Sequence, residues 1–177
     1  MPTRGELEAA RDRQVEDVLA PSLRVVFCGI NPGLYTAWAG HHFARPGNRF
    51  WKALHLSGFT PRLFHPSEQD RLPALGLGVT NLVPRTTARA DELGVEELAA
   101  GAAALRAKLR RYRPAWLAVL GAGAYRAAFA APGAGKQPEL LEDARAWLLP
   151  NPSGLNAHYQ LPALVEEFAR LRRASEA

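Results

Sequence analysis

Two asparagines are the residues whose type and spacing most clearly suggest chemistry. Asn31 directly follows the apolar run RVVFCGI and precedes Pro32 and Gly33, while Asn151 directly follows the run ARAWLLP and precedes the residues PSG. An asparagine before proline is held in an extended backbone conformation, and its side-chain amide offers a donor beside an acceptor. Asn-Pro also occurs as an ordinary strand stop. Two copies, each beside loops rich in glycine or aromatic residues, favour a polar site over that alternative.

Other motifs that could carry chemistry are incomplete. GINPGL lacks the third glycine of a dinucleotide fingerprint, and GAGAYR has no acidic residue about 20 positions on at the end of a second strand. GAGKQ lacks the first glycine and the Ser or Thr of a phosphate-binding P-loop. Ser153 lies in NPSGL, not in the GxSxG of a nucleophile elbow. The histidines are scattered or directly adjacent, so we predict neither a metal site nor a cofactor.

Composition is typical of a soluble globular chain. Hydrophobic residues make up 47% of the 177 residues and charged residues 22%. No run approaches the roughly 20 apolar residues of a membrane span, and residues 1–21 are too charged for a signal peptide. The lone Cys28 cannot form an internal disulfide, which favours a reduced, cytoplasmic location. The net charge of +5, mostly from arginine, suits a polyanion partner, although GC-rich coding also raises arginine use.

Apolar runs alternate with amphipathic patterns along the chain. We expect strands at 24–30, 77–83, 115–121 and 144–150. We expect helices at 4–19, 48–58, 66–76, 95–112, 122–130 and 162–173, and a loop at 131–138.

The expected strands are apolar throughout instead of alternating, which is typical of a parallel sheet covered on both faces. We therefore predict a three-layer α/β/α sandwich with a mainly parallel central sheet. It would form a single domain over residues 1–177, with a peripheral N-terminal helix within residues 1–22. Ligands of open α/β sheets bind outside the carboxyl ends of the strands. Both Asn-Pro turns, and the long connection at 33–47, should therefore meet at one edge.

Four motifs together resemble one family. GINPG, NRFW, GVTNLVPRTT and LPNPSGL are similar to the mismatch-specific uracil/thymine DNA glycosylases of the uracil-DNA glycosylase superfamily, from about Arg24 to the closing helix. The resemblance implies a monomeric, metal-free, monofunctional enzyme of the cytoplasm and nucleoid that flips uracil out of duplex DNA. It would hydrolyse the N-glycosidic bond of uracil, and also of thymine or cytosine adducts, in mismatches with guanine. That reaction initiates base excision repair.

The resemblance also implies roles for individual residues. Asn31 matches the asparagine that positions the attacking water, and Phe43 matches the aromatic residue on which the flipped base stacks. Gly33 stands where strict uracil enzymes have a tyrosine that excludes the thymine methyl group. The implied base pocket comprises Gly29, Ile30, Gly33, Phe43 and Asn151. The implied wedge, which fills the vacated stack and reads the widowed guanine, comprises Ser153, Gly154, Leu155 and Asn156.

Asp91 is a second catalytic candidate. A side-chain amide such as that of Asn31 is not a base near neutral pH, whereas a carboxylate could activate the water. PRTTARADEL follows the strand at 77–83, so Asp91 should run from the same edge, where Arg85 and Arg89 could contact phosphate. The alternative is that Asp91 merely caps the following helix.

The chain departs from the family pattern in two places. Asn156 and Ala157 follow Leu155 where relatives often have Ser then Arg, and Asn81 stands where some have Lys. Two other functions stay open beside the glycosylase. One is a non-catalytic nucleic-acid binding module with a degenerate glycosylase fold. The other is a nucleotide-binding oxidoreductase that would use GAGAYR.

Overall fold

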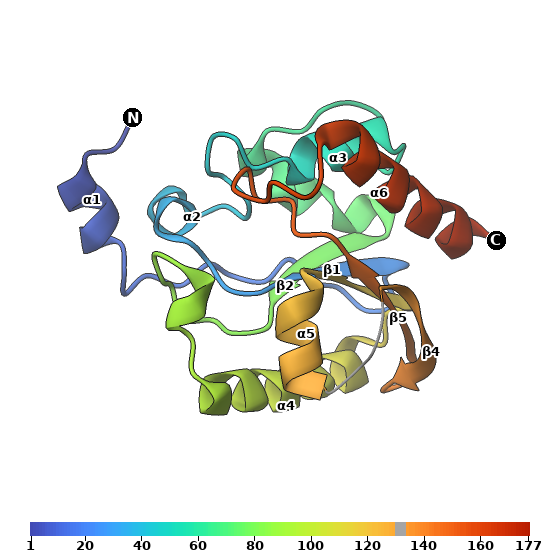
Figure 1. Cartoon of the computed structure of the whole chain (residues 1–177). Helices are drawn as coiled ribbons and strands as arrows, with labels where there is room; N and C mark the ends of the chain where they lie inside the picture. Colours follow the sequence, from blue (N-terminus) through green and yellow to red (C-terminus); the bar gives the residue numbers. More distant parts are fainter. Residues whose placement is uncertain (130–133) are drawn as a thin grey trace.

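A five-stranded sheet lies between two layers of helices in the computed structural model, which describes residues 1–129 and 134–177 (Figure 1). The strand order is β2-β1-β3-β5-β4, and all neighbours are parallel except β4 and β5. The strands are β1 (Val25–Gly29), β2 (Leu77–Asn81), β3 (Trp116–Leu120), β4 (Gly135–Leu141) and β5 (Ala144–Leu149). The predicted α/β/α fold with a mainly parallel sheet is confirmed.

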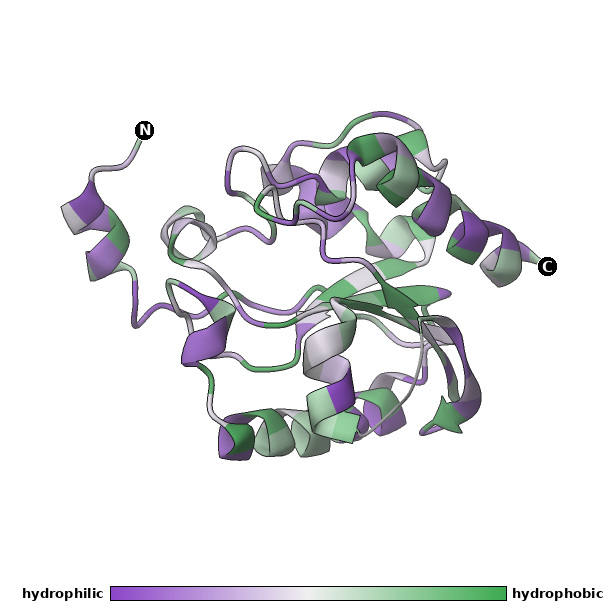
Figure 2. Ribbon diagram, in the orientation of Figure 1, coloured by the Kyte–Doolittle hydropathy of each residue, from purple (hydrophilic) through white to green (hydrophobic). Residues whose placement is uncertain are grey.

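Alternate residues of the central strands feed two hydrophobic cores, which explains why their sequences are apolar throughout. Phe27 of β1 packs on Phe50 and Phe168, with ring centroids 5.4 and 5.9 Å apart. These partners come from α3 (Phe50–Leu56) and α6 (Leu161–Glu176). The neighbouring residue Val26 enters the other core, beneath α4 (Val95–Tyr112) and α5 (Ala122–Phe129). Figure 2 shows mainly apolar strands between helices that combine polar and apolar residues.

The N-terminal helix is much shorter than predicted. α1 (Arg4–Ala9) begins with a capping box between Thr3 and Glu6, and none of its residues is buried. The residues that follow do not continue the helix. Instead the chain extends, and Val18 exchanges backbone hydrogen bonds of 2.8 and 2.9 Å with Val79, which covers the outer edge of β2. The prediction of a helix at 4–19 is therefore wrong beyond its first turns.

Several connections contain short helices or a strand where the sequence predicted a loop or a single helix. Residues 131–133 of the predicted 131–138 loop lie outside the described part of the chain, as does residue 130 of the predicted helix at 122–130, but β4 occupies residues 135–138. β4 is an edge strand, the place in a sheet that tolerates a proline such as Pro138. The predicted helix at 66–76 is two 3₁₀ helices, η1 (Pro66–Arg71) and η2 (Pro73–Leu75). The connection at 33–47 contains α2 (Leu34–Ala39).

The carboxyl ends of β1, β2, β3 and β5 meet at one edge of the sheet, because these strands are parallel. Both Asn-Pro turns therefore reach that edge. Within the described residues, no helix combines the length and apolar character needed to cross a membrane. Nor do three His, Cys, Asp or Glu side chains gather anywhere in that part of the chain as a metal site would require.

Candidate active site

A cavity of about 170 Å³ opens at the carboxyl edge of the sheet. It brings together seven of the residues predicted from the sequence: Gly29, Ile30, Asn31, Gly33, Phe43, Asn151 and Ser153. Gly154 and Leu155 line a groove beside it, and Leu155 and Asn156 line a second groove on the other side of their loop. Asp91 is not among the described lining residues, although Ala88 and Ala90 are.

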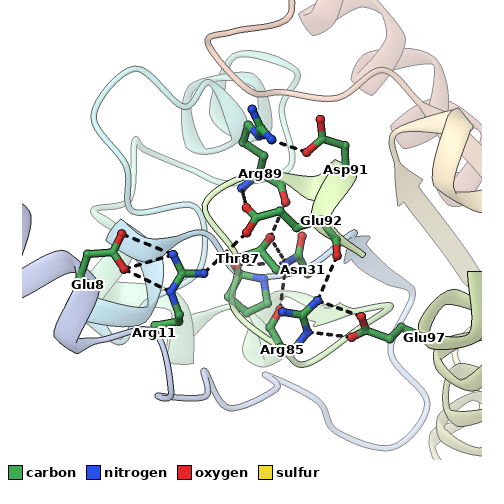
Figure 3. Close-up of polar contacts among 10 residues, drawn as sticks. Glu8, Arg11, Asn31, Arg85, Thr87, Arg89, Asp91, Glu92 and Glu97 are labelled. Atoms are coloured by element: carbon green, nitrogen blue, oxygen red, sulfur yellow. Dashed lines mark hydrogen bonds and ion pairs between the residues drawn. The ribbon is translucent and has the colours of Figure 1, made fainter. Parts of the chain in front are cut away.

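The amide of Asn31 is held in one orientation. Its Nδ2 donates to Thr87 Oγ1 at 2.8 Å, to the Arg85 carbonyl at 2.9 Å and to the Pro32 carbonyl at 3.3 Å (Figure 3). The Thr87 hydroxyl donates its own hydrogen bond to the Arg89 carbonyl at 2.7 Å, so toward Asn31 it can only be an acceptor. Because the nitrogen faces acceptors, Oδ1 is the atom left for the cavity. An oxygen there can accept a hydrogen bond from a water and leave the water's lone pair free for attack.

Thr87 should therefore matter for the rate of any reaction that uses a water on Asn31. Thr87→Val keeps the shape of the side chain and removes the acceptor. We expect the single-turnover rate to fall about 3- to 10-fold, since one hydrogen bond contributes ~0.5–1.5 kcal/mol. Thermal melting and DNA affinity, measured on the same variant, should change little. An unchanged rate would show that the Arg85 carbonyl alone suffices to orient the amide.

The floor of the cavity requires a glycine. A Cβ on Gly29 would lie 2.7 Å from Asn81 Oδ1 and 3.4 Å from the Phe43 ring. Phe43 itself has a φ of 54°, in the left-handed region that few side chains adopt, and its ring lies 4.1 Å from that of Phe50. This conformation leaves the Phe43 ring half-buried at the cavity wall, where a planar group could stack on it.

Asn81 is a lining residue to which the sequence assigned no role. It is the last residue of β2 and is 8% exposed. Its Nδ2 lies 3.5 Å from His42 Nδ1, so its Oδ1 points to the cavity floor near Gly29. The signal that could have found it is its position, because it ends a buried strand at the same edge as Asn31.

Asn151 has the opposite orientation. Its Oδ1 accepts from the backbone N–H of Ser153 at 2.9 Å, which closes a turn and leaves Nδ2 as the free group. The Asn156 side chain donates to the Asn151 carbonyl at 3.0 Å. Asn31 and Asn81 thus present amide oxygens to the cavity, and Asn151 presents an amide nitrogen.

The loop after Asn151 is fixed by a half-buried arginine, to which the sequence also assigned no role. The Arg49 guanidinium donates to the carbonyls of Ser153 at 2.7 Å, of Pro152 at 3.3 Å and of Tyr159. On the facing side, a Cβ on Gly154 would lie 2.7 Å from the Gly47 carbonyl oxygen, so only glycine fits there. Arg49 lies in the motif NRFW, which the resemblance had singled out only as a pattern.

Leu155 stands at the tip of this fixed loop and is 77% exposed. A large apolar side chain held in water on a fixed loop has no role in the core. Its place between two grooves suits insertion into another molecule.

Asp91 lies in the 3₁₀ helix η3 (Ala90–Glu92), outside the cavity. Its carboxylate pairs with Arg89 at 3.1 Å, is 72% exposed and turns away from the Asn31 amide (Figure 3). It does not cap α4, which begins after Gly94. A catalytic role for Asp91 therefore stays a prediction, and one that requires its side chain to move.

The arginines flanking this segment already have partners. Arg85 makes two 2.8 Å bonds with Glu97, which raises the pKa of the guanidinium, and its backbone carbonyl holds Asn31. Arg11, just after α1, reaches Glu92 at 3.7 Å and so connects the N-terminal segment to η3. The structure thus gives Arg85 a role in fixing the Asn31 loop, and its predicted phosphate contact stays a prediction.

The cavity is polar but almost uncharged. Arg45 is the only Lys, Arg, Asp or Glu among its described lining residues. Burial lowers the pKa of His42, which therefore stays neutral. Burial also raises the pKa of the Cys28 thiol to about 12, so that thiol is no nucleophile. The site suits a small, planar, neutral ring with hydrogen-bonding edges, together with a water.

One comparison with known proteins bears on this site. The family model described as the uracil DNA glycosylase superfamily matches residues 16–173. The matched range includes every strand of the sheet, the lining residues of the cavity and the Leu155 loop, and leaves out α1.

Proposed function

Because the chain belongs to the uracil DNA glycosylase superfamily, and so to a class of enzymes that release bases from DNA, we propose that its substrate is uracil opposite guanine. Thymine and 5-substituted cytosines in the same mismatch would be slower substrates. The enzyme would act as a metal-free monomer of the cytoplasm, since one chain supplies both the pocket and the wedge. Its product would initiate base excision repair.

The observation that carries this proposal is the fixed orientation of three amides in one cavity. Uracil offers an N3–H donor and two carbonyl acceptors. Asn81 Oδ1 can accept from N3–H, and its remaining N–H can donate to O4. Asn151 Nδ2 is free to donate to the other carbonyl or to the adjoining phosphate. Phe43 provides the stacking surface.

The reaction follows from the place of Asn31. The N1–C1′ bond breaks with its electron pair on the base, and the water held by Asn31 Oδ1 adds its oxygen to C1′. The proton lost from that water passes to solvent or to the departing uracil anion, because an amide cannot take it. No lysine lines the described cavity. The enzyme should therefore release the free base and leave an intact abasic site.

Extrusion of the base needs a group that replaces it in the stack. Leu155 is the exposed apolar side chain beside the cavity, and Arg49 and Gly154 fix its loop. Flipping costs a few kcal/mol of unstacking and unpairing. A rigid leucine lowers that cost in duplex DNA by filling the gap.

The direct test is base release from labelled duplexes, read as strand cleavage after alkali. Guanine–uracil duplex should be cut, guanine–thymine duplex more slowly and undamaged duplex not at all. Binding to the uracil duplex without release would instead support the non-catalytic binding module.

The range of substrates depends on Gly33. A Cβ on Gly33 would meet no atom within 4 Å, so the cavity is open there and the residue tolerates a side chain. Gly33→Tyr should lower activity on thymine and 5-substituted pyrimidines at least ~10-fold more than on uracil, because a ring would occupy the space of the 5-substituent. Gly33→Ala is the matched control and should change the ratio little. The measurement is the ratio of single-turnover rates; a wild-type enzyme without activity on 5-substituted bases would contradict the role of Gly33.

A further inference from the structure

His42 is the most completely fixed side chain at the cavity. It is 1% exposed, its backbone N–H donates to Gln69 Oε1 at 2.8 Å, and its carbonyl accepts from Trp51 Nε1 at 3.0 Å. The imidazole Nε2 lies 2.7 Å from the Glu16 carbonyl oxygen, and Nδ1 lies 3.5 Å from Asn81 Nδ2. The ring therefore bridges the N-terminal segment and a residue of the base pocket.

These contacts determine where the protons lie. A backbone carbonyl can only accept, so Nε2 carries the proton that bonds Glu16. In a neutral ring Nδ1 is then an acceptor. The atom of Asn81 that faces it must be the NH₂ nitrogen, as the structure has it. No described residue donates to the opposite atom, Asn81 Oδ1, which faces the pocket floor beside Gly29.

We propose that His42 is a positioning residue that fixes the Asn81 amide so that the pocket accepts uracil and rejects cytosine. The inference rests on the proposed function, since it assigns Asn81 to the base. Rotating an amide by half a turn exchanges its oxygen and its nitrogen. The rotated amide would match cytosine, whose N3 is an acceptor and whose N4 is a donor.

Selection at this edge is what a uracil-excising enzyme most needs. A guanine–cytosine pair and a guanine–uracil mismatch differ, within the flipped base, only at N3 and the 4-position. Asn81 left free to rotate could satisfy either base. The Glu16 carbonyl fixes the proton of His42 on Nε2, which leaves Nδ1 as an acceptor. An acceptor at Nδ1 excludes the orientation of the Asn81 amide in which its oxygen faces His42.

The surroundings of His42 keep it in the neutral form that this role needs. Burial lowers its pKa most strongly, and His41 and Lys108 lower it further. The bond to the Glu16 carbonyl and the charge of Asp17 act in the other direction, but Lys108 pairs with Asp17 at 2.8 Å. The other groups against the ring and its backbone, from Asn81, Gln69 and Trp51, are uncharged.

Two amide substitutions of different length separate the contacts of the ring. The amide of an asparagine lies where the imidazole has Nδ1. His42→Asn therefore keeps an acceptor for the Asn81 amide and loses the hydrogen bond to the Glu16 carbonyl. The amide of a glutamine reaches the position of Nε2. His42→Gln therefore keeps the hydrogen bond to the Glu16 carbonyl and loses the acceptor that faces Asn81. The substrates are duplexes with 5-fluorouracil or 5-fluorocytosine opposite guanine, which share the 5-substituent and differ only at N3 and the 4-position. Single-turnover rates on both give a preference ratio.

We expect His42→Gln to lower the preference for 5-fluorouracil about 10-fold or more, on the scale of one bidentate base contact, and His42→Asn to retain most of it. Two results would overturn the proposal. One is that His42→Gln lowers the rates on both substrates equally, and the other is that His42→Gln keeps the preference for 5-fluorouracil while His42→Asn loses it. ¹⁵N shifts of His42 in the wild-type protein test it without substitution, because a proton on Nδ1 would also overturn it. A wild-type enzyme that releases neither base would refute the proposed function itself.

Discussion

Replacing Asn31 with alanine should lower the single-turnover rate of uracil release about 10²-fold or more and leave the protein folded. Its Oδ1 is the cavity atom placed to hold the water, while Nδ2 is fixed by Thr87 and the Arg85 carbonyl. A displacement of about 1 Å in a reacting group can cost 10²-fold. The half-buried side chain packs at the rim of the core, so we expect only a small drop in melting temperature.

Two companion measurements make this result specific. DNA affinity should stay close to that of the wild type, since Asn31 contacts neither the Leu155 loop nor a charged group. Asp91→Ala, assayed in parallel, decides the second candidate. A loss of about 10²-fold with normal melting would identify a catalytic carboxylate. An unchanged rate would leave Asn31 as the polar side chain that acts on the water.

Leu155→Ala should lower the rate on duplex DNA about 10- to 100-fold and the rate on single-stranded DNA far less. Only the duplex must be unstacked and unpaired, at a cost of a few kcal/mol, and 1.4 kcal/mol corresponds to tenfold. Stability should not change, because the side chain is 77% exposed.

Leu140→Ala is the matched control for the wedge. Leu140 is 60% exposed and lies on β4, an edge strand of the sheet, outside the cavity and its flanking grooves. Its replacement should leave both rates unchanged. If Leu155→Ala lowers the rates on duplex and single strand equally, then Leu155 supports the pocket and is not a wedge.

The sheet was predictable because its inner strands are buried on both faces. Residues such as Val25 and Val26 enter opposite cores, so the whole run must be apolar. β4 was missed because it has exposed residues and a proline at the sheet's edge, which a sequence pattern does not distinguish from a loop. The helix predicted at 4–19 was too long because the charged residues of this segment are compatible with a helix locally. In the structure Val18 instead pairs with Val79 of β2, a contact between residues far apart in the sequence.

The site was predictable as a set of residues but not as an arrangement of atoms. Asn31, Phe43 and Asn151 meet at one cavity because parallel strands end at one edge. Which amide atom faces the cavity depends on partners more than 50 residues away, such as Thr87 for Asn31. Arg49 likewise acts through carbonyls over 100 residues along the chain. Such partners are set by tertiary packing and leave no local pattern.

The central claim is that this cavity hydrolyses the glycosidic bond of uracil with a water held by Asn31. The measurement that tests it most directly is a product analysis of guanine–uracil duplex under single turnover, with wild type and Asn31→Ala side by side and borohydride present in a parallel reaction. The account predicts free uracil and an alkali-labile abasic strand from the wild type, about 10²-fold less of both from the variant, and no enzyme–DNA adduct with borohydride. Tight binding without free uracil, a trapped adduct, or equal product from the two proteins would contradict it.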